Sequence, residues 1–172
     1  MSQLARRYHL VIAALVPLFL VQAQVAGAES KNISGTGRAV ALLSESKVSS
    51  SGEPQHDISV IVREDTDRSP APDFDNAKVH HVSTSDCVAG NCTDKGYRTY
   101  NLRTGDRTFA VYEGTIKIVP ASNGPPDVSF AGKWWFIGGQ GKFRGITGGG
   151  TYKGELTPTG VAYSWEGEYE VK

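Results

Sequence analysis

The sequence has no excess of charge of either sign and very little cysteine. Its 172 residues include 18 basic and 18 acidic side chains, so the formal net charge is zero. No basic patch or charge run stands out, which excludes nucleic acid as an expected partner. A convincing helix is also missing, because apolar residues never recur at helical spacing over a sufficient length. These absences point away from helical and nucleic-acid-binding proteins.

Several motifs of known chemistry are missing as well. The glycine run Gly138–Gly150 does not match the G-x₄-G-K-[ST] pattern of a phosphate-binding loop and follows a strand without opening a helix. No serine, histidine and aspartate order typical of a hydrolase is legible. His80 and His81 are adjacent, and no two histidines have the spacing of metal ligands. We therefore expect neither a metal nor a cofactor.

The N-terminus has the features of a secretory signal peptide. Arg6 and Arg7 form a basic region, the apolar run Leu10–Val21 follows, and Ala26-Gly27-Ala28 fits a small-x-small cleavage site. The apolar run is shorter than the roughly 20 residues of a membrane span, although an uncleaved anchor is the alternative. We expect a signal peptide over residues 1–28, one domain over 29–172, and export to the periplasm or the extracellular space without a stable membrane span.

The two cysteines, Cys87 and Cys92, enclose the short stretch Val88–Asn91. An exported chain meets an oxidising compartment, so a local disulfide is the expected state. It would stabilise the fold by roughly 2 kcal/mol, because the closed loop is small. A metal pair would need further ligands, and a redox dithiol usually has the C-x-x-C spacing.

What the chain does contain is short runs rich in β-branched and aromatic residues, separated by Gly, Pro, Asn and Asp. Period-two alternation over His56–Arg63 places His56 in phase with Ile58, Val60 and Val62. The predicted strands are Thr36–Leu43, His56–Arg63, Ala77–Ser83, Tyr97–Leu102, Arg107–Val119, Val128–Ile137, Thr151–Leu156 and Val161–Lys172. The predicted loops include Ser44–Pro54, Glu64–Asn76 and the glycine-rich connector Gly138–Gly150.

The pattern predicts an all-β fold of eight antiparallel strands. Such a set closes into a barrel or folds into a sandwich. Large rings and mid-strand glycines favour the barrel, because sharp bends of a strand need glycine. An eight-stranded barrel has an interior that just holds side chains or one small ligand.

The C-terminal half resembles a known family. The segment Gly138–Tyr152 is similar to the G-x-G-x-F-x-G-x-x-G-x-G-x-Y pattern of bacterial exported proteins with an allene oxide cyclase-like or dirigent-like barrel. Glu113-Gly114-Thr115 and the terminal run from Tyr163 to Tyr169 resemble the same group. The resemblance implies a calycin-like barrel with a cavity at one end. Plant members of the group cyclise a fatty-acid epoxide or steer phenoxy-radical coupling by holding a reactive substrate in shape. Dimers and trimers occur in this group, so a homo-oligomer is a possible state.

The candidate site consists of inward-facing polar and aromatic side chains. His81 and His80 lie on one strand, so only one of them faces inward, and His56 could lie at a barrel mouth. Tyr112 should point inward and Glu113 outward. Arg98 and Arg107, which flank a hairpin, are expected to pair with acidic groups on the surface. The ligand-pocket candidates are His56, His81, Tyr112, Trp134, Phe136, Tyr163 and Trp165.

Three functions remain open at this point. The first is an exported barrel that binds a small apolar or aromatic molecule without catalysis. The second is a cofactor-free isomerase or cyclase in which Tyr112, His81 and Trp134 shape and polarise the substrate. The third is a structural or interaction protein with a filled barrel, whose sheet edge or outer Trp135 contacts a partner. An open cavity with a carboxylate near His or Tyr favours the second function.

Overall fold

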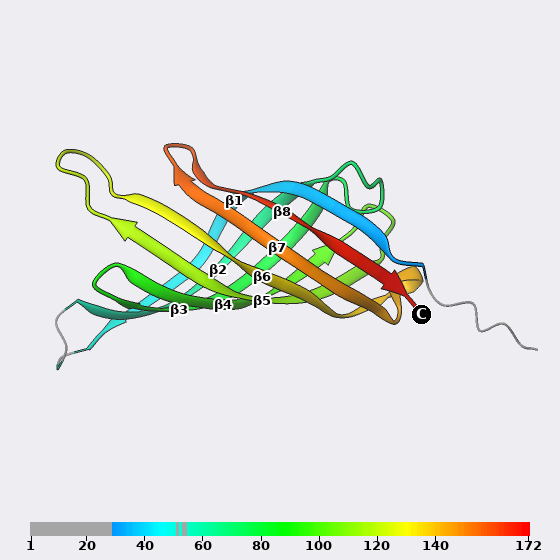
Figure 1. Ribbon diagram of the computed structural model, residues 1–172, viewed down its shortest axis with the longest axis horizontal. Coiled ribbons are helices and arrows are strands. Elements are labelled where there is room, and N and C mark those ends of the chain that lie inside the picture. Colours follow the sequence, from blue (N-terminus) through cyan, green and yellow to red (C-terminus); the bar gives the residue numbers. More distant parts are fainter. Residues whose placement is uncertain (1–28, 51, 53–54) are drawn as a thin grey trace, which may run out of the picture.

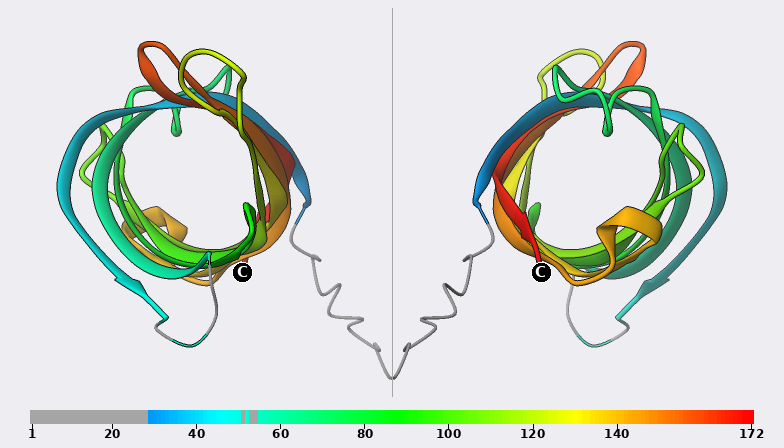
Figure 2. Two further views of the ribbon diagram at one scale, coloured as in Figure 1. Left: turned by 90° about the vertical axis from the view of Figure 1, so that its left-hand side faces the viewer. Right: turned by 90° about the vertical axis from the view of Figure 1, so that its right-hand side faces the viewer.

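The computed structural model describes residues 29–50, 52 and 55–172, so the predicted signal peptide lies outside the described residues. The described chain forms one closed antiparallel barrel in which each strand pairs with the next and β8 pairs with β1 (Figures 1 and 2). The predicted eight-stranded fold is confirmed. The elements are β1 Lys31–Ser49, β2 His56–Arg68, β3 Ala77–Val88, β4 Asn91–Asn101, β5 Arg107–Val119, β6 Asp127–Gln140, η1 Gly141–Phe143, β7 Ile146–Thr157 and β8 Gly160–Val171.

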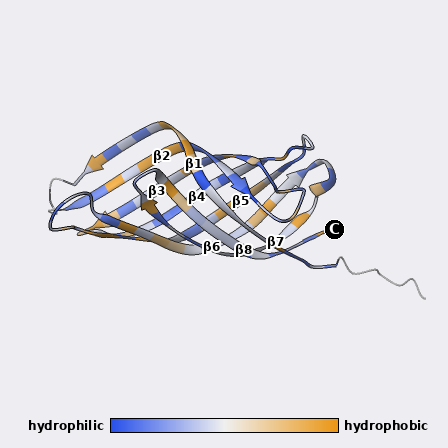
Figure 3. Ribbon diagram, turned by 90° about the horizontal axis from the view of Figure 1, so that it is seen from above, coloured by the Kyte–Doolittle hydropathy of each residue, from blue (hydrophilic) through white to orange (hydrophobic). Residues whose placement is uncertain are grey.

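Alternation of apolar and polar residues along the strands separates the barrel interior from its outer surface (Figure 3). The predicted disulfide is confirmed: Cys87 and Cys92 are direct partners on β3 and β4, next to the hairpin turn. No helix within the described ranges is long and apolar enough to cross a membrane.

One end of the barrel is packed with aromatic rings. Phe74 comes from the β2–β3 connection and lies 5.2 Å from the Phe143 ring of η1 and 5.5 Å from the Tyr169 ring of β8. Phe136 of β6 lies 6.1 Å from Phe74. Since full burial of one such side chain contributes about 2 kcal/mol or more, these rings hold the end shut. We call this group of four rings the packed end.

Glycines opposite the inner rings determine how the remaining interior is filled. Gly35 pairs with Trp165 and Gly37 with Tyr163 across β1 and β8. A Cβ atom at Gly37 would lie 2.2 Å from the Tyr163 ring. Each ring therefore crosses a neighbouring strand where no side chain stands in the way. Gly96 with Tyr112 and Gly154 with Phe130 repeat this arrangement.

The strand boundaries correct the sequence prediction in several places. The predicted strands Ala77–Ser83 and Tyr97–Leu102 are too short, because β3 continues to Val88 and β4 begins at Asn91. β1 runs through most of the predicted loop Ser44–Pro54, to Ser49. β2 continues to Arg68, into the predicted loop Glu64–Asn76, because Asp65 and Asp67 have partners inside the barrel. The glycine-rich connector is also shorter than predicted, since β6 ends at Gln140 and β7 begins at Ile146.

Replacement of Gly37 by alanine should destabilise the fold by about 1–3 kcal/mol, the usual cost of overpacking a core. The new methyl group would collide with the Tyr163 ring, whereas nothing lies within 4 Å of a Cβ at the exposed Gly52. Urea denaturation of the Gly37→Ala and Gly52→Ala variants measures the difference. Equal stability of the two variants would contradict the packing of rings over glycines.

Candidate functional site

A cavity of about 190 Å³ occupies the half of the barrel away from the packed end and is partly open to solvent. Its outer part is formed by Val128, beside the β5–β6 connection, and by Leu156 and Val161, beside the β7–β8 turn. The lining residues come from every strand except β1. They are Ile61, Arg63, His81, Ser83, Ser85, Asp94, Arg98, Tyr100, Tyr112, Ile116, Val128, Phe130, Trp134, Tyr152, Leu156, Val161, Tyr163 and Trp165.

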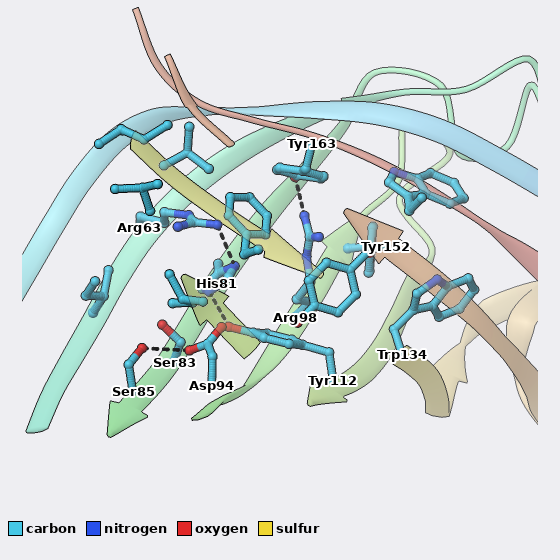
Figure 4. Close-up of a pocket in the computed structure, with 18 residues that line it drawn as sticks. Arg63, His81, Ser83, Ser85, Asp94, Arg98, Tyr112, Trp134, Tyr152 and Tyr163 are labelled. Atoms are coloured by element: carbon cyan, nitrogen blue, oxygen red, sulfur yellow. Dashed lines mark hydrogen bonds between the residues drawn. The ribbon is translucent and has the colours of Figure 1, made fainter. Parts of the chain in front are cut away.

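The cavity has one apolar and one polar side. Aliphatic side chains and the rings of Phe130, Trp134 and Trp165 supply the apolar surface. The inward positions of β3 and β4 instead carry short polar groups, because His81, Ser83 and Ser85 alternate with outward residues. We call His81, Ser83, Ser85, Asp94, Tyr112 and Arg63 the polar wall; Figure 4 shows them grouped on one side of the cavity.

Tyr112 and His81 form the central contact of the polar wall. The Tyr112 hydroxyl lies 2.9 Å from His81 Nε2, and Arg63 Nη2 lies 3.3 Å from His81 Nδ1. A guanidinium can only donate a hydrogen bond. Because Asp65 Oδ2 is farther from Nδ1, at 3.6 Å, we assign Nδ1 as the acceptor from Arg63. Nε2 then carries the ring proton and donates to Tyr112, which keeps its own O–H proton for a further acceptor.

The surroundings keep His81 neutral. Burial, reinforced by the nearby positive charges of Arg63 and Arg98, lowers the pKa of His81 to about 4. Burial also raises the pKa of Tyr112 above its ordinary value. At neutral pH the contact therefore joins an uncharged imidazole to a protonated phenol.

Asp94 is the carboxyl group that lines the cavity. Ser85 Oγ donates a hydrogen bond to its Oδ1 at 2.8 Å, and the carboxyl group lies beside the Tyr112 hydroxyl (Figure 4). Burial raises the pKa of Asp94 above its ordinary value, although Ser85 and Tyr112 partly oppose this effect. A carboxylate with a raised pKa is a stronger proton acceptor than one exposed to water.

A buried ion cluster supports the polar wall from behind. Arg98 donates to the Tyr163 hydroxyl and lies 3.4 Å from both Asp65 Oδ2 and Asp67 Oδ1. Tyr163 in turn donates to Asp67. Burial raises the pKa of Asp65, but the positive charges of Arg98 and Arg63 oppose it, and that pKa lies well below its usual range. Burial raises the pKa of Asp67 against the opposing charge of Arg98.

Two cavity-lining side chains carry a buried polar atom without a hydrogen-bond partner among the described residues. These atoms are Arg98 Nε and Tyr152 Oη. The arginine nitrogen can only donate, and the tyrosine hydroxyl can donate as well. The cavity therefore offers donors from which an oxygen of a ligand could accept a hydrogen bond.

The structure brings most of the predicted site residues together. His81, Tyr112, Trp134, Tyr163 and Trp165 all line the cavity. His81 is the inward member of the histidine pair, since it is 4% exposed and His80 is exposed on the outer face.

Two predicted site residues lie elsewhere. Phe136 faces inward but belongs to the packed end. His56 lies away from the cavity lining, with its Nε2 atom 2.8 Å from Asp86 Oδ1. Its predicted inward phase does not hold, because Ile61 and Arg63 line the cavity while Ile58 and Val60 are exposed.

Sequence reasoning missed the carboxylates of the site. The charged segment Glu64–Asn76 predicts a loop for Asp65 and Asp67, and no local pattern distinguishes Asp94 as a site residue. The signal was the alternation of Ile61, Arg63, Asp65 and Asp67, which continues the β2 period. Arg98 was expected to pair with surface acids, but it is 8% exposed and pairs with buried ones. No group of three or more potential metal ligands occurs within the described part of the chain.

Comparison with known proteins shows a likeness in fold. No family model matches the chain, and no curated protein matches its sequence. The structure is similar to that of the pterocarpan synthase dirigent protein GePTS1, with a TM-score of 0.47 and 12% identity, over 96% of this chain and 99% of that chain. Identity at this level assigns no function.

The lowered pKa of His81 predicts that stability falls as the pH drops from 7 to 4.5. The unfolded chain, in which the imidazole has its ordinary pKa, takes up a proton that the folded chain does not, so folding becomes less favourable by about 2 kcal/mol. Urea unfolding of the wild type and of His81→Gln at both pH values measures this contribution. Because Asp67 and Asp94 titrate in both proteins, the difference between the two losses of stability belongs to His81. An equal loss of stability in the two proteins would contradict a neutral, buried His81.

Proposed function

We propose that this barrel binds a small, mainly apolar molecule that contains a ring and at least one oxygen. The observation that carries the proposal is the cavity, which combines an apolar surface with the polar wall. Most ligand pockets have this composition, with few polar groups that fix the orientation of the ligand.

The size of the cavity limits the part of the ligand that is enclosed. An apolar cavity of about 150 Å³ is large enough for benzene. The cavity here measures about 190 Å³, so it suits one ring with a short substituent. A longer molecule could extend through the open side, between Leu156 and Val128.

The donors in the cavity favour a hydroxyl or carbonyl group on that ring. Arg98 and Tyr152 each carry an unpartnered buried polar atom, and both side chains line the cavity. Burial of such atoms without a partner costs roughly 1–3 kcal/mol each. A ligand oxygen that accepts from one of them removes part of that cost.

Titration with 4-propylphenol and with propylbenzene tests the proposal. The phenol should bind about fivefold more tightly, because one added hydrogen bond contributes about 1 kcal/mol. Binding is measured by calorimetry and by fluorescence, since Trp134 and Trp165 line the cavity.

Ile61→Trp and Val60→Trp provide a matched pair on one strand. Ile61 lines the cavity, whereas Val60 is exposed. The first variant should weaken phenol binding at least about tenfold by filling the cavity, and the second should leave it within about twofold. Equal binding by two folded variants, or no binding by the wild type, would overturn the proposal.

A second candidate function is a cofactor-free isomerisation, favoured by the position of Asp94 beside Tyr112. Asp94 would accept a proton from the carbon next to a ligand carbonyl, while the unpartnered Tyr152 hydroxyl donates a hydrogen bond to the carbonyl oxygen. Return of the proton to another carbon gives an isomer of the substrate. The reaction needs no oxidant, because no electrons are lost.

Deuterium exchange tests this chemistry without knowledge of the natural substrate. In D₂O, the protein should accelerate exchange of the protons next to the carbonyl of 4-phenyl-2-butanone, measured by NMR. Asp94→Asn should remove the acceleration while the ketone still binds. Glu113→Gln, which changes an exposed carboxylate on β5, should retain it. Absence of exchange in the wild type, or equal exchange in the two variants, would refute isomerisation and leave the binding function as tested above.

A further inference from the structure

A broad groove lies on the outer surface of the barrel, whereas the cavity described above lies in its interior. It has a volume of about 930 Å³ and lies over the outward positions of β1, β2 and β5 to β8. Its floor consists of small side chains, most with hydroxyl groups. They are Thr36, Thr66, Thr115, Ser129, Ala131, Ala162 and Ser164.

Four cationic side chains border this groove. Arg38 and Arg68 come from β1 and β2, and Lys117 and Lys153 come from β5 and β7. All four are exposed, and none forms a hydrogen bond or ion pair with another residue of the described chain. Glu155 is the one carboxylate among the lining residues, so the groove has an excess of positive charge.

The strand register places like charges close together. Thr36 is the partner of Arg68, and Arg38 is the partner of Thr66, so the two arginines are diagonal neighbours on one face. Diagonal positions in a sheet lie about 7–8 Å apart, within reach of long side chains. Two unpaired positive charges at this separation repel each other, and a bound anion between them relieves the repulsion.

We infer that this outer groove binds an acidic polysaccharide, with carboxylate or sulfate groups on the four cations and sugar hydroxyls on the threonines and serines of the floor. The length of the groove across several strands suits an extended chain rather than a single small anion. Hydroxyl side chains can both donate to and accept from sugar hydroxyl groups. Glu155 can accept from a sugar hydroxyl in the same way.

The lining argues against two other anionic partners. Single-stranded nucleic acids bind through rings that stack on bases. The two rings at this groove belong to Phe130 and Tyr163, which line the interior cavity, and Tyr163 is only 6% exposed. A membrane surface is bound by apolar side chains that enter the lipid, whereas the outward side chains here are small, polar or charged.

Fluorescence anisotropy tests the inference. Fluorescein-labelled polygalacturonate and heparin oligosaccharides are titrated with the domain over residues 29–172 at several salt concentrations. We expect binding that weakens as salt rises, because exposed charges are screened. Neutral dextran should not bind. The double variant Arg38→Gln, Arg68→Gln should bind about tenfold more weakly, since each exposed charge contact contributes up to about 1 kcal/mol.

The double variant Lys95→Gln, Lys133→Gln is the matched control. Both lysines are exposed on β4 and β6 and lie outside the groove lining, and the change in net charge is the same. It should retain the wild-type affinity within about twofold. Absence of glycan binding would overturn the inference. So would an equal loss in the two double variants, or tighter binding to single-stranded DNA of equal charge or to phosphatidylserine vesicles. Because Arg38 and Arg68 do not line the cavity, phenol binding should be unchanged in every variant.

Discussion

The ion cluster around Arg98 is the interaction on which the interior of this barrel depends. Its guanidinium comes from β4, the two carboxylates from β2 and the phenol from β8, so one group of contacts joins strands across the barrel. A buried ion pair stabilises a protein little beyond what apolar packing would, but removal of one partner costs about 3–5 kcal/mol. The cluster therefore specifies one arrangement of the interior more than it adds stability.

That arrangement determines the chemistry of the cavity. Asp65 accepts a hydrogen bond from Arg63 Nε at 2.9 Å and lies next to His81. Arg63 directs the His81 proton toward Tyr112, and Tyr112 lies beside Asp94. Charge placed deep in the interior thus determines which proton is offered at the cavity surface.

The division of the barrel into a packed and a hollow half follows from side-chain size. Four rings from β6, β8, η1 and the β2–β3 connection fill one end. In the other half, the rings of Trp165, Tyr163 and Tyr112 lie over glycines of the neighbouring strands. Space remains between the rings because the strand beneath each ring contributes no side chain of its own.

Much of the fold could be predicted from the sequence, but only part of the site. The strands at Arg107–Val119 and near Val161–Lys172 were recognisable because inward rings alternate with outward polar residues. The inward rings and Tyr112 followed from the same period. The burial of Asp65 and Asp67 could not be predicted in this way, because a buried charge needs a partner, and here the partner comes from a distant strand. The outer groove could not be predicted from the sequence either, because only closure of the barrel brings Arg38 and Lys153 to one surface.

The central claim is that the hollow half of the barrel is a binding site, and a crystal structure of the protein with 4-propylphenol tests it most directly. The account predicts one phenol ring between Trp134 and the polar wall, with its oxygen at hydrogen-bond distance from Tyr112 or from an unpartnered donor of the cavity. An interior filled by protein side chains, or a phenol bound only on the outer surface, would contradict it.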